Sequence, residues 1–194
     1  LEQRERDQVL IQFANRSCPV LVATDVAARG LDITGLEAVI NVDVTPDAEL
    51  HIHRVGRTGR ADAEGWAFSL ASLDEMGRVG RIEQLQGREF EWQPLTELTP
   101  TGSGPQGSES SVPLRAPMVT LQILGGRKEK IRAGDVLGAL TKDQGLPGAK
   151  IGKINVNEFS TYVAVAREIA DKALKALNDG KVKGKRVKAR PVEN

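Results

Sequence analysis

Apolar positions in the first hundred residues follow two different spacings. In residues 2–15 the apolar side chains recur on one face of a helix, which predicts an amphipathic α-helix. Three short apolar runs follow, of the kind found in buried parallel strands, and they span residues 20–24, 37–42 and 65–70. We expect Trp66 and Phe68, in the last run, to be core or strand-packing residues and not ligand contacts. Because strand-like and helical stretches alternate, we expect an α/β sheet with ligand loops at the carboxyl ends of its strands.

The pattern changes after residue 118. Strand-like segments span residues 119–124, 151–156, 161–166 and 182–192, and helical segments span residues 134–140 and 167–178. In the second helical segment the apolar residues lie on one face, and Gly180 follows as a helix stop. The order βαββαβ within about 75 residues predicts an RRM-like sandwich of the ferredoxin type.

A segment rich in Gly, Ser and Pro separates the two patterns. Residues 99–117 are polar and have no apolar periodicity, which is typical of a flexible linker. We therefore predict an incomplete α/β domain in residues 1–98, a linker in residues 99–117 and an RRM-like domain in residues 118–194. Charge supports this division. Residues 1–117 contain 11 Arg, no Lys and 18 acidic residues, a net charge of −7, whereas the rest contains 11 Lys, 5 Arg and 8 acidic residues, a net charge of +8.

Composition is that of a globular protein. The chain has 194 residues and 40% hydrophobic residues, enough for one large or two small cores. Its single cysteine, Cys18, cannot form an internal disulfide and is expected to be a small buried or half-buried side chain. No apolar run approaches about 18 residues and no signal-peptide pattern opens the chain, so the sequence predicts neither membrane insertion nor export, and we expect a cytoplasmic monomer.

The segment HRVGRTGR (residues 53–60) carries the clearest chemical signal. A guanidinium is planar, always charged and able to hold two phosphate oxygens, so two arginines in a glycine-rich loop suit phosphoryl transfer. Arg57 and Arg60 are candidate arginine fingers. Taken alone, the pair has a simpler explanation, which is ion pairing with Asp62 and Glu64 on an exposed turn.

Two further motifs precede this loop in a fixed order, QRER (residues 3–6) and ATDVAARGLDI (residues 23–33). With HRVGRTGR they resemble motifs IVa, V and VI in the second RecA-like domain of DEAD-box RNA helicases. The histidine that opens the last motif, where related DEAH and RecQ-type helicases usually have glutamine, favours RNA over DNA. The resemblance implies a partial RecA-like parallel-sheet domain.

The resemblance also implies roles for individual residues. Arg57 and Arg60 would reach the β/γ-phosphate region of ATP held by the first RecA-like domain, with His53 in the catalytic network across the cleft. Asp32 would lie near the nucleotide ribose. Contacts to the RNA backbone, which bind without reading bases, would come from Gln3, Arg6, Thr24, Arg29 and Gly30. The alternatives are structural: a turn cap for Asp32, and solvent-exposed positions for the polar residues of the first helix.

Other parts of such an enzyme are missing from this sequence. It contains no GxxxxGKS/T phosphate loop and no DEAD motif, so ATP and Mg²⁺ would be bound mainly by an N-terminal RecA-like domain. We expect the chain to be a carboxyl-terminal piece of a longer enzyme, inactive alone, with apolar surface that the rest would cover.

The RRM-like domain lacks most of the aromatic residues that stack on bases in this fold. Tyr162 lies at one aromatic position of the RNP1 pattern, but Ser160 and Thr120 occupy others, and Glu158 replaces a basic residue. Three basic segments offer an alternative RNA surface. They include Lys128 and Lys130, then Lys150 and Lys153, then residues 181–190.

The tail reading GDVLGALTKDQGL, IGKINV, YVAVA and GKVKGKRVKAR resembles the DbpA group of bacterial DEAD-box proteins. This implies an RNA-dependent ATPase and helicase that acts on 23S ribosomal RNA during large-subunit assembly. The tail would hold a ribosomal RNA hairpin on pre-50S particles. Two alternatives remain: a non-catalytic RNA-binding module, or a general DEAD-box helicase whose tail tethers it to messenger or membrane-associated complexes.

Overall fold

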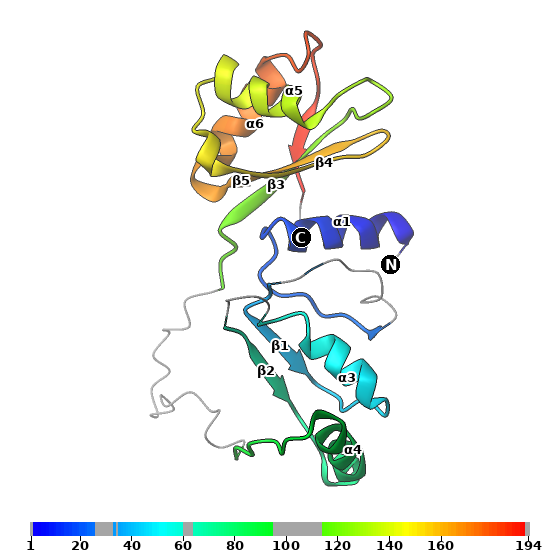
Figure 1. Cartoon of the computed structure of the whole chain (residues 1–194). Coiled ribbons are helices and arrows are strands. Elements are labelled where there is room, and N and C mark those ends of the chain that lie inside the picture. The colour runs from blue at the N-terminus through cyan, green and yellow to red at the C-terminus, as the bar shows by residue number, and fades with distance from the viewer. Residues whose placement is uncertain (1, 26–32, 34, 60–63, 95–113, 193–194) are drawn as a thin grey trace, which may run out of the picture. The chain divides into compact units, whose positions relative to one another are not determined.

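The computed structural model describes residues 2–25, 33, 35–59, 64–94 and 114–192. By its contacts the chain divides into two compact units, residues 30–110 and residues 1–29 with 111–194, and each is considered by itself. One contains a parallel sheet and the other an antiparallel sheet (Figure 1), so the expected α/β class is confirmed. The domain boundaries expected from the sequence, after residue 98 and before residue 118, are not tested by this division and stay predictions.

The unit of residues 30–110 is built around a short parallel pair. Strand β1 (Ala38–Asn41) pairs with β2 (Trp66–Ser69), as their apolar runs predict. Helix α3 (Ala48–Val55) follows β1, and a 3₁₀ turn (Leu73–Glu75) leads into α4 (Met76–Gln86). The Asp47 carboxylate begins α3 by accepting two backbone N–H bonds, at 3.0 and 3.3 Å. A small core forms where the two helices meet, from Val44, Val79 and Ile82, with Ala48, Ala71 and Phe90 against it.

Two expectations about apolar residues need correction: Trp66 and Phe68 pack along the strand and not in the core, and residues 20–24 form no strand. Trp66 and Phe68 are 67% and 42% exposed, and their rings stack on each other at 6.0 Å instead of entering the core. The described part of this sheet has two strands, so no neighbouring layer covers these side chains. Residues 20–24 form no strand, and Val22 is 93% exposed. A parallel strand needs a hydrogen-bonded neighbour, and none of the described strands pairs with this run.

The antiparallel sheet has four strands in the order β4-β5-β3-β6. Its elements are β3 (Met118–Ile123), α5 (Ala133–Gly138), a π-helical turn (Ala139–Asp143), a 3₁₀ turn (Gly148–Lys150), β4 (Ile151–Val156), β5 (Thr161–Ala166), a 3₁₀ turn (Arg167–Ile169), α6 (Ala170–Asp179) and β6 (Ala189–Pro191). This is the predicted βαββαβ order. The last strand is shorter than expected, because Lys183 and Gly184 have φ values of 52° and 76° and turn the chain back before β6 begins.

The main core of the protein lies between this sheet and its helices. Alternate residues of β3 and β5 point toward α5 and α6, which cover the same face of the sheet (Figure 1). The most deeply buried of these side chains include Leu121, Ile123, Val136, Leu140, Val163, Val165, Ala173 and Leu177. The buried core fixes the sheet, and with it the loops at either end.

Helix α1 (Gln3–Ala14) confirms the helix predicted for residues 2–15, and Glu2 and Glu5 form a capping box at its start. The contacts of α1 place it in the same compact unit as the antiparallel sheet. Just after the helix, the Asn15 amide donates to Thr120 Oγ1 at 3.2 Å, and the Ser17 hydroxyl lies 2.6 Å from the same oxygen. Thr120 is 1% exposed, so this part of the sheet face opposite α5 and α6 is covered. No helix among the described residues is long and apolar enough to cross a membrane.

Candidate nucleic-acid interface

The arginine loop is anchored to the start of the parallel sheet. Helix α3 ends at Val55, and the next residues bridge to Leu36. The Leu36 N–H donates to the Arg57 carbonyl at 3.1 Å, and the Thr58 hydroxyl donates to the Leu36 carbonyl. Gly65 lies so close that a Cβ there would be 2.0 Å from Thr58 Oγ1. The backbone around half-buried Arg57 is therefore held on both sides, as a positioned guanidinium requires.

Neighbouring basic residues have other surroundings. Arg54 Nη1 donates to Asn41 Oδ1 at 3.4 Å and to the Asp43 carbonyl at 3.1 Å, so Arg54 ties α3 to the end of β1. His53, predicted to be catalytic, is exposed on α3. Two other predicted nucleotide contacts, Arg60 and Asp32, lie outside the described residues.

His51 is the buried histidine of this unit. It is 1% exposed, and its ring meets Phe90 edge to face at 5.7 Å. Burial lowers its pKa below the ordinary 6.5, and the positive charge of Arg54 lowers it further. His51 Nδ1 has no hydrogen-bond partner. Both effects disfavour the protonated form of this ring, which lies inside the unit, whereas His53 is exposed.

Three of the residues predicted to contact the RNA backbone, Gln3, Arg6 and Thr24, lie in the unit that contains the antiparallel sheet. Gln3 is exposed and donates to Asp7 Oδ1 at 2.7 Å along α1. Arg6 is half-buried, and Thr24 is exposed in an irregular segment. Arg29 and Gly30 lie outside the described residues. Their assignment to RNA stays a prediction.

Two loops at one end of the antiparallel sheet are joined by their backbones. Loop 125–131 follows β3, and turn 157–160 connects β4 to β5. The N–H groups of Arg127 and Lys128 donate to the carbonyls of Asn157 and Glu158, at 2.9 and 3.0 Å. Gly126 permits this approach, because a Cβ there would lie 2.3 Å from the Asn157 oxygen. The two loops therefore form one rigid edge.

The predicted lysines divide between the two ends of the sheet. Lys183 Nζ donates to the Lys130 carbonyl at 2.7 Å, so the first and third basic segments meet beside turn 157–160. Lys150 lies before the first residue of β4 and pairs with Glu168 at 2.5 Å. Since β4 spans six residues, this end lies roughly 20 Å from the turn. Lys153 is exposed on β4 between the two ends.

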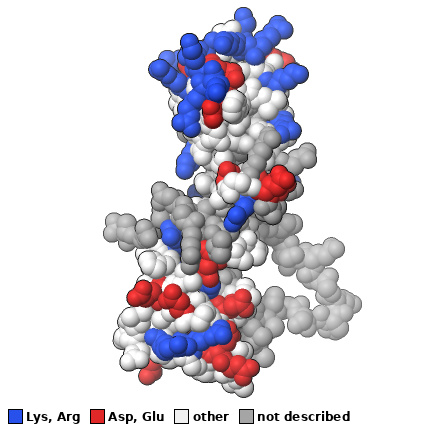
Figure 2. All heavy atoms as spheres, turned by 90° about the vertical axis from the view of Figure 1, so that its right-hand side faces the viewer, with Lys and Arg blue, Asp and Glu red and all other residues white. Residues whose placement is uncertain are grey.

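Charge is concentrated on this unit. Lysine and arginine side chains crowd the face of the antiparallel unit shown in Figure 2, whereas acidic side chains are prominent on the other unit. An open cavity of about 520 Å³ lies in the loop edge, lined by Arg127, Lys128 and Glu158. Phe159, 65% exposed, adjoins it with Lys128 Nζ 5.2 Å from the ring centre. Our sequence reasoning missed Phe159. The sequence feature that could have identified it is an aromatic residue in the short turn between two strands, where neither face of the sheet can bury the ring.

Tyr162 has a different environment from the one an RNP1 position suggests. It is 5% exposed, and its hydroxyl accepts a hydrogen bond from Gln122 Nε2 at 3.0 Å. Gln122 Oε1 in turn accepts from Arg190 Nε at 2.9 Å. The polar row across β6, β3 and β5 is thus satisfied internally. A stacking role for Tyr162 stays a prediction that requires its ring to be uncovered.

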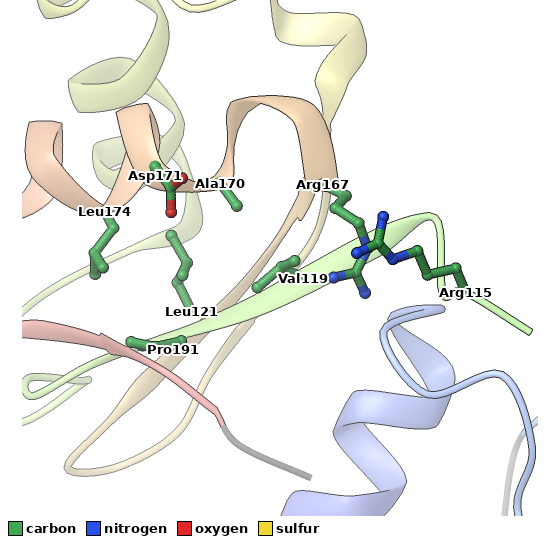
Figure 3. A pocket seen from close by; sticks show the side chains of 8 residues that line it. All are labelled: Arg115, Val119, Leu121, Arg167, Ala170, Asp171, Leu174 and Pro191. Carbon is green, nitrogen blue, oxygen red and sulfur yellow. The ribbon is translucent and has the colours of Figure 1, made fainter. Parts of the chain in front are cut away.

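A second cavity, of about 300 Å³, opens near α6 (Figure 3). Arg115 and Arg167 lie at one end, and Asp171 lies on α6. Arg167 Nε donates to the Ala116 carbonyl at 2.7 Å, so this guanidinium holds the chain that enters β3. Apolar side chains form most of the remaining lining, namely Val119, Leu121, Ala170, Leu174 and Pro191. This cavity has the character of a gap in core packing.

Comparison with known proteins matches both units. Residues 1–62 match the helicase conserved C-terminal domain, and residues 120–191 match the DbpA RNA binding domain. The helicase match includes α1, although α1 contacts the antiparallel sheet in this structure. The crystal structure of the E. coli DEAD-box protein SrmB bound to regulator of ribonuclease activity A is 32% identical, with a TM-score of 0.47, and the match covers 55% of this chain and 62% of that one.

Two curated relatives match almost the whole chain. The ATP-dependent RNA helicase DbpA of Escherichia coli K12 is 50% identical over 190 residues, which cover 98% of this chain and 39% of that protein. The protein of the same name from Bacillus subtilis 168 is 34% identical, with 96% of this chain and 41% of that protein covered. The chain thus spans about two fifths of the length of these relatives. With a helicase C-terminal domain and a DbpA RNA binding domain in one sequence, it belongs to the DbpA type of RNA helicase and corresponds to a carboxyl-terminal part of such a protein.

Proposed function

We propose that the whole protein is an ATP-dependent RNA helicase that acts on a 23S ribosomal RNA hairpin in pre-50S particles, as a cytoplasmic monomer in large-subunit assembly. The observation that carries this proposal is the joining, in one chain, of an arginine loop anchored to a parallel sheet and a basic RRM-like domain. The near full-chain similarity to the E. coli and B. subtilis proteins supports it.

In this proposal the helicase unit supplies nucleotide contacts from one side of a cleft. Arg57 and Arg60 bind the β/γ-phosphates, His53 joins the catalytic network and Asp32 contacts the ribose. The anchored backbone of Arg57 fits that role, because a guanidinium must be positioned before charge develops on the phosphate. The described residues contain no group of three or more His, Cys, Asp or Glu side chains that could hold a metal ion. The resemblance to DEAD-box helicases supports assigning Mg²⁺ mainly to the first RecA-like domain, and we expect this segment alone to be inactive.

The RRM-like domain supplies the choice of RNA. Its basic loops hold the ribosomal hairpin, while one strand of the neighbouring duplex is held by its backbone, without base reading, through Gln3, Arg6, Thr24, Arg29 and Gly30. ATP-driven closure of the two RecA-like domains then bends that strand and opens the neighbouring duplex. The RRM-like domain thus provides the specificity for RNA, and the RecA-like domains provide the force that opens the duplex.

The test compares RNA targets. The present chain is titrated with a 23S ribosomal hairpin and with a scrambled hairpin of equal length at one salt concentration, because protein–RNA affinity depends strongly on salt. We expect clear preference for the ribosomal hairpin. Equal binding would indicate a general helicase tail, and no binding at all would exclude RNA as the partner of this domain.

A further inference from the structure

Phe159 is exposed in a way that the fold does not require. The Asn157 N–H donates to the Ser160 carbonyl at 2.8 Å and closes a tight turn with Glu158 and Phe159 at its tip. The ring is 65% exposed and takes no part in the hydrophobic core. Residues 118–194 contain two aromatic side chains, and the other, Tyr162, is buried. Phe159 is thus the ring that this domain presents to solvent.

The turn that holds Phe159 is rigid. Its Asn157 and Glu158 carbonyls accept hydrogen bonds from loop 125–131, and Thr161 Oγ1 donates to the Gly125 carbonyl at 2.8 Å in a buried position. An aromatic ring on such a support loses little conformational entropy when a flat ligand covers it.

One cation lies over the ring, and further basic residues belong to the same edge. Lys128 Nζ lies 5.2 Å from the Phe159 centroid and 3.3 Å from Glu158 Oε1. Glu158 offsets one positive charge, and Asp135, 4.0 Å from Lys183 Nζ, offsets another in part. The attraction for an anion therefore rests on Arg127 and Lys130 as well. A nucleotide has a flat base and a charged phosphate. The exposed ring can stack on the base, and the cations beside the open cavity can bind the phosphate.

We propose that Phe159 is a stacking platform for one unpaired RNA base, with Arg127 and Lys128 holding the adjoining phosphate. This inference rests on the proposed RNA-binding function and locates it at the loop edge. Paired bases are already stacked within a helix, so the platform selects an RNA with an unstacked nucleotide, such as a hairpin loop or a single-stranded flank.

The experiment uses the present chain and two RNAs, a hairpin with 2-aminopurine in its unpaired loop and a blunt duplex of equal charge. Phe159→Leu removes the ring and keeps an apolar side chain, whereas Phe159→Trp keeps a stacking surface. Stacking on an aromatic residue is worth about 1–3 kcal/mol per base, so Phe159→Leu should weaken hairpin binding roughly 5- to 150-fold. It should also abolish 2-aminopurine quenching, with duplex binding unchanged. Phe159→Trp should keep both the affinity for the hairpin and the quenching of 2-aminopurine.

Thermal unfolding of both variants establishes that the fold is kept, as expected for an exposed turn residue. If the wild-type chain binds the hairpin and Phe159→Leu binds it equally well, the stacking platform is refuted, whereas the proposed RNA-binding function is not. An equal loss for hairpin and duplex would also refute the platform, since that result indicates a general contact. If the wild-type chain bound neither RNA, the proposed function would fail together with the platform.

Discussion

Gln122 Nε2 donates to the Tyr162 hydroxyl at 3.0 Å on the sheet face turned away from α5 and α6. Gln122 also accepts from Arg190, so the three side chains form a continuous row across three strands. Both Gln122 and Tyr162 are buried. The sheet face opposite the helices thus carries a hydrogen-bonded polar network, and the exposed ring of Phe159 lies at the loop edge.

The first prediction concerns this network. Tyr162→Phe deletes the hydroxyl and leaves the Gln122 amide without its acceptor, which should lower the free energy of unfolding by about 1–2 kcal/mol. We expect RNA affinity at 25 °C to change less than twofold. Hydrogen exchange of β3 and β5 amides measures the stability of this unit. A tenfold loss of RNA affinity at unchanged stability would instead show that Tyr162 contacts RNA.

The second prediction concerns the contact between the two loops. Gly126→Ala places a Cβ against the Asn157 carbonyl, and overpacking of this kind costs about 1–3 kcal/mol. The variant should be less stable and should bind RNA more weakly, because loop 125–131 must move. Gly134→Ala is the matched control. A Cβ at Gly134, in α5, would meet no atom within 4 Å, so this change should be neutral or slightly stabilising. Equal stability of the two variants would contradict the close approach.

The third prediction separates the two groups of lysines. Removing one lysine that binds an RNA phosphate should reduce the slope of log affinity against log salt by about one. Replacing Lys128 and Lys130 by Gln should flatten the slope by up to about two. Replacing Lys150 and Lys153 by Gln should have a smaller effect, because Lys150 lies at the other end of β4 and Lys153 lies along the strand, both away from the loop edge. Fluorescence anisotropy at several salt concentrations measures both slopes. A larger change for the second pair would move the interface away from the loop edge.

The fourth prediction is a pH dependence from His51. Its pKa is lowered in the folded unit, so the unfolded state binds a proton more readily. Stability should therefore be full above pH 6.5 and fall as the pH drops below this value toward the folded pKa. Both tryptophans, Trp66 and Trp92, belong to this unit, so their fluorescence follows its urea unfolding selectively.

Two variants assign this pH effect to one residue. His51→Leu should flatten the profile between pH 5.5 and 7.5, whereas His53→Gln, at an exposed site on the same helix, should not. The lowered pKa of Glu75, caused first by hydrogen bonds from Ser72, keeps that carboxylate charged throughout this window. A profile that His51→Leu leaves unaltered would contradict the assignment.

The fifth prediction concerns catalysis in the full-length protein. Arg57→Ala should abolish RNA-stimulated ATP hydrolysis, since arginine fingers in other phosphoryl-transfer enzymes contribute roughly 10³ to 10⁵ in rate. RNA binding by the RRM-like domain should be unchanged. Arg88→Ala, at an exposed position after α4, serves as the control and should retain turnover. Steady-state phosphate release measures both, and normal turnover of Arg57→Ala would refute the finger role.

The order and type of most elements follow from local sequence patterns. The spacing of apolar residues predicted α1, β1, β2 and the whole βαββαβ order, because these periodicities arise from local backbone geometry. The motif in residues 53–60 also identified the arginine loop. Its anchoring to Leu36 could not be predicted, since that contact joins residues about twenty positions apart through a side-chain hydroxyl.

Tertiary structure decided which side chains are covered. Trp66 and Phe68 have the composition of a buried strand, yet the two-stranded sheet leaves them exposed; Tyr162 has the spacing of a stacking residue, yet its neighbours bury it. Phe159 was invisible to periodicity because it lies in a turn. Burial depends on neighbours that are distant in sequence, whereas periodicity reports only the local backbone, so the exposed aromatic ring could be found only once the loops were placed together.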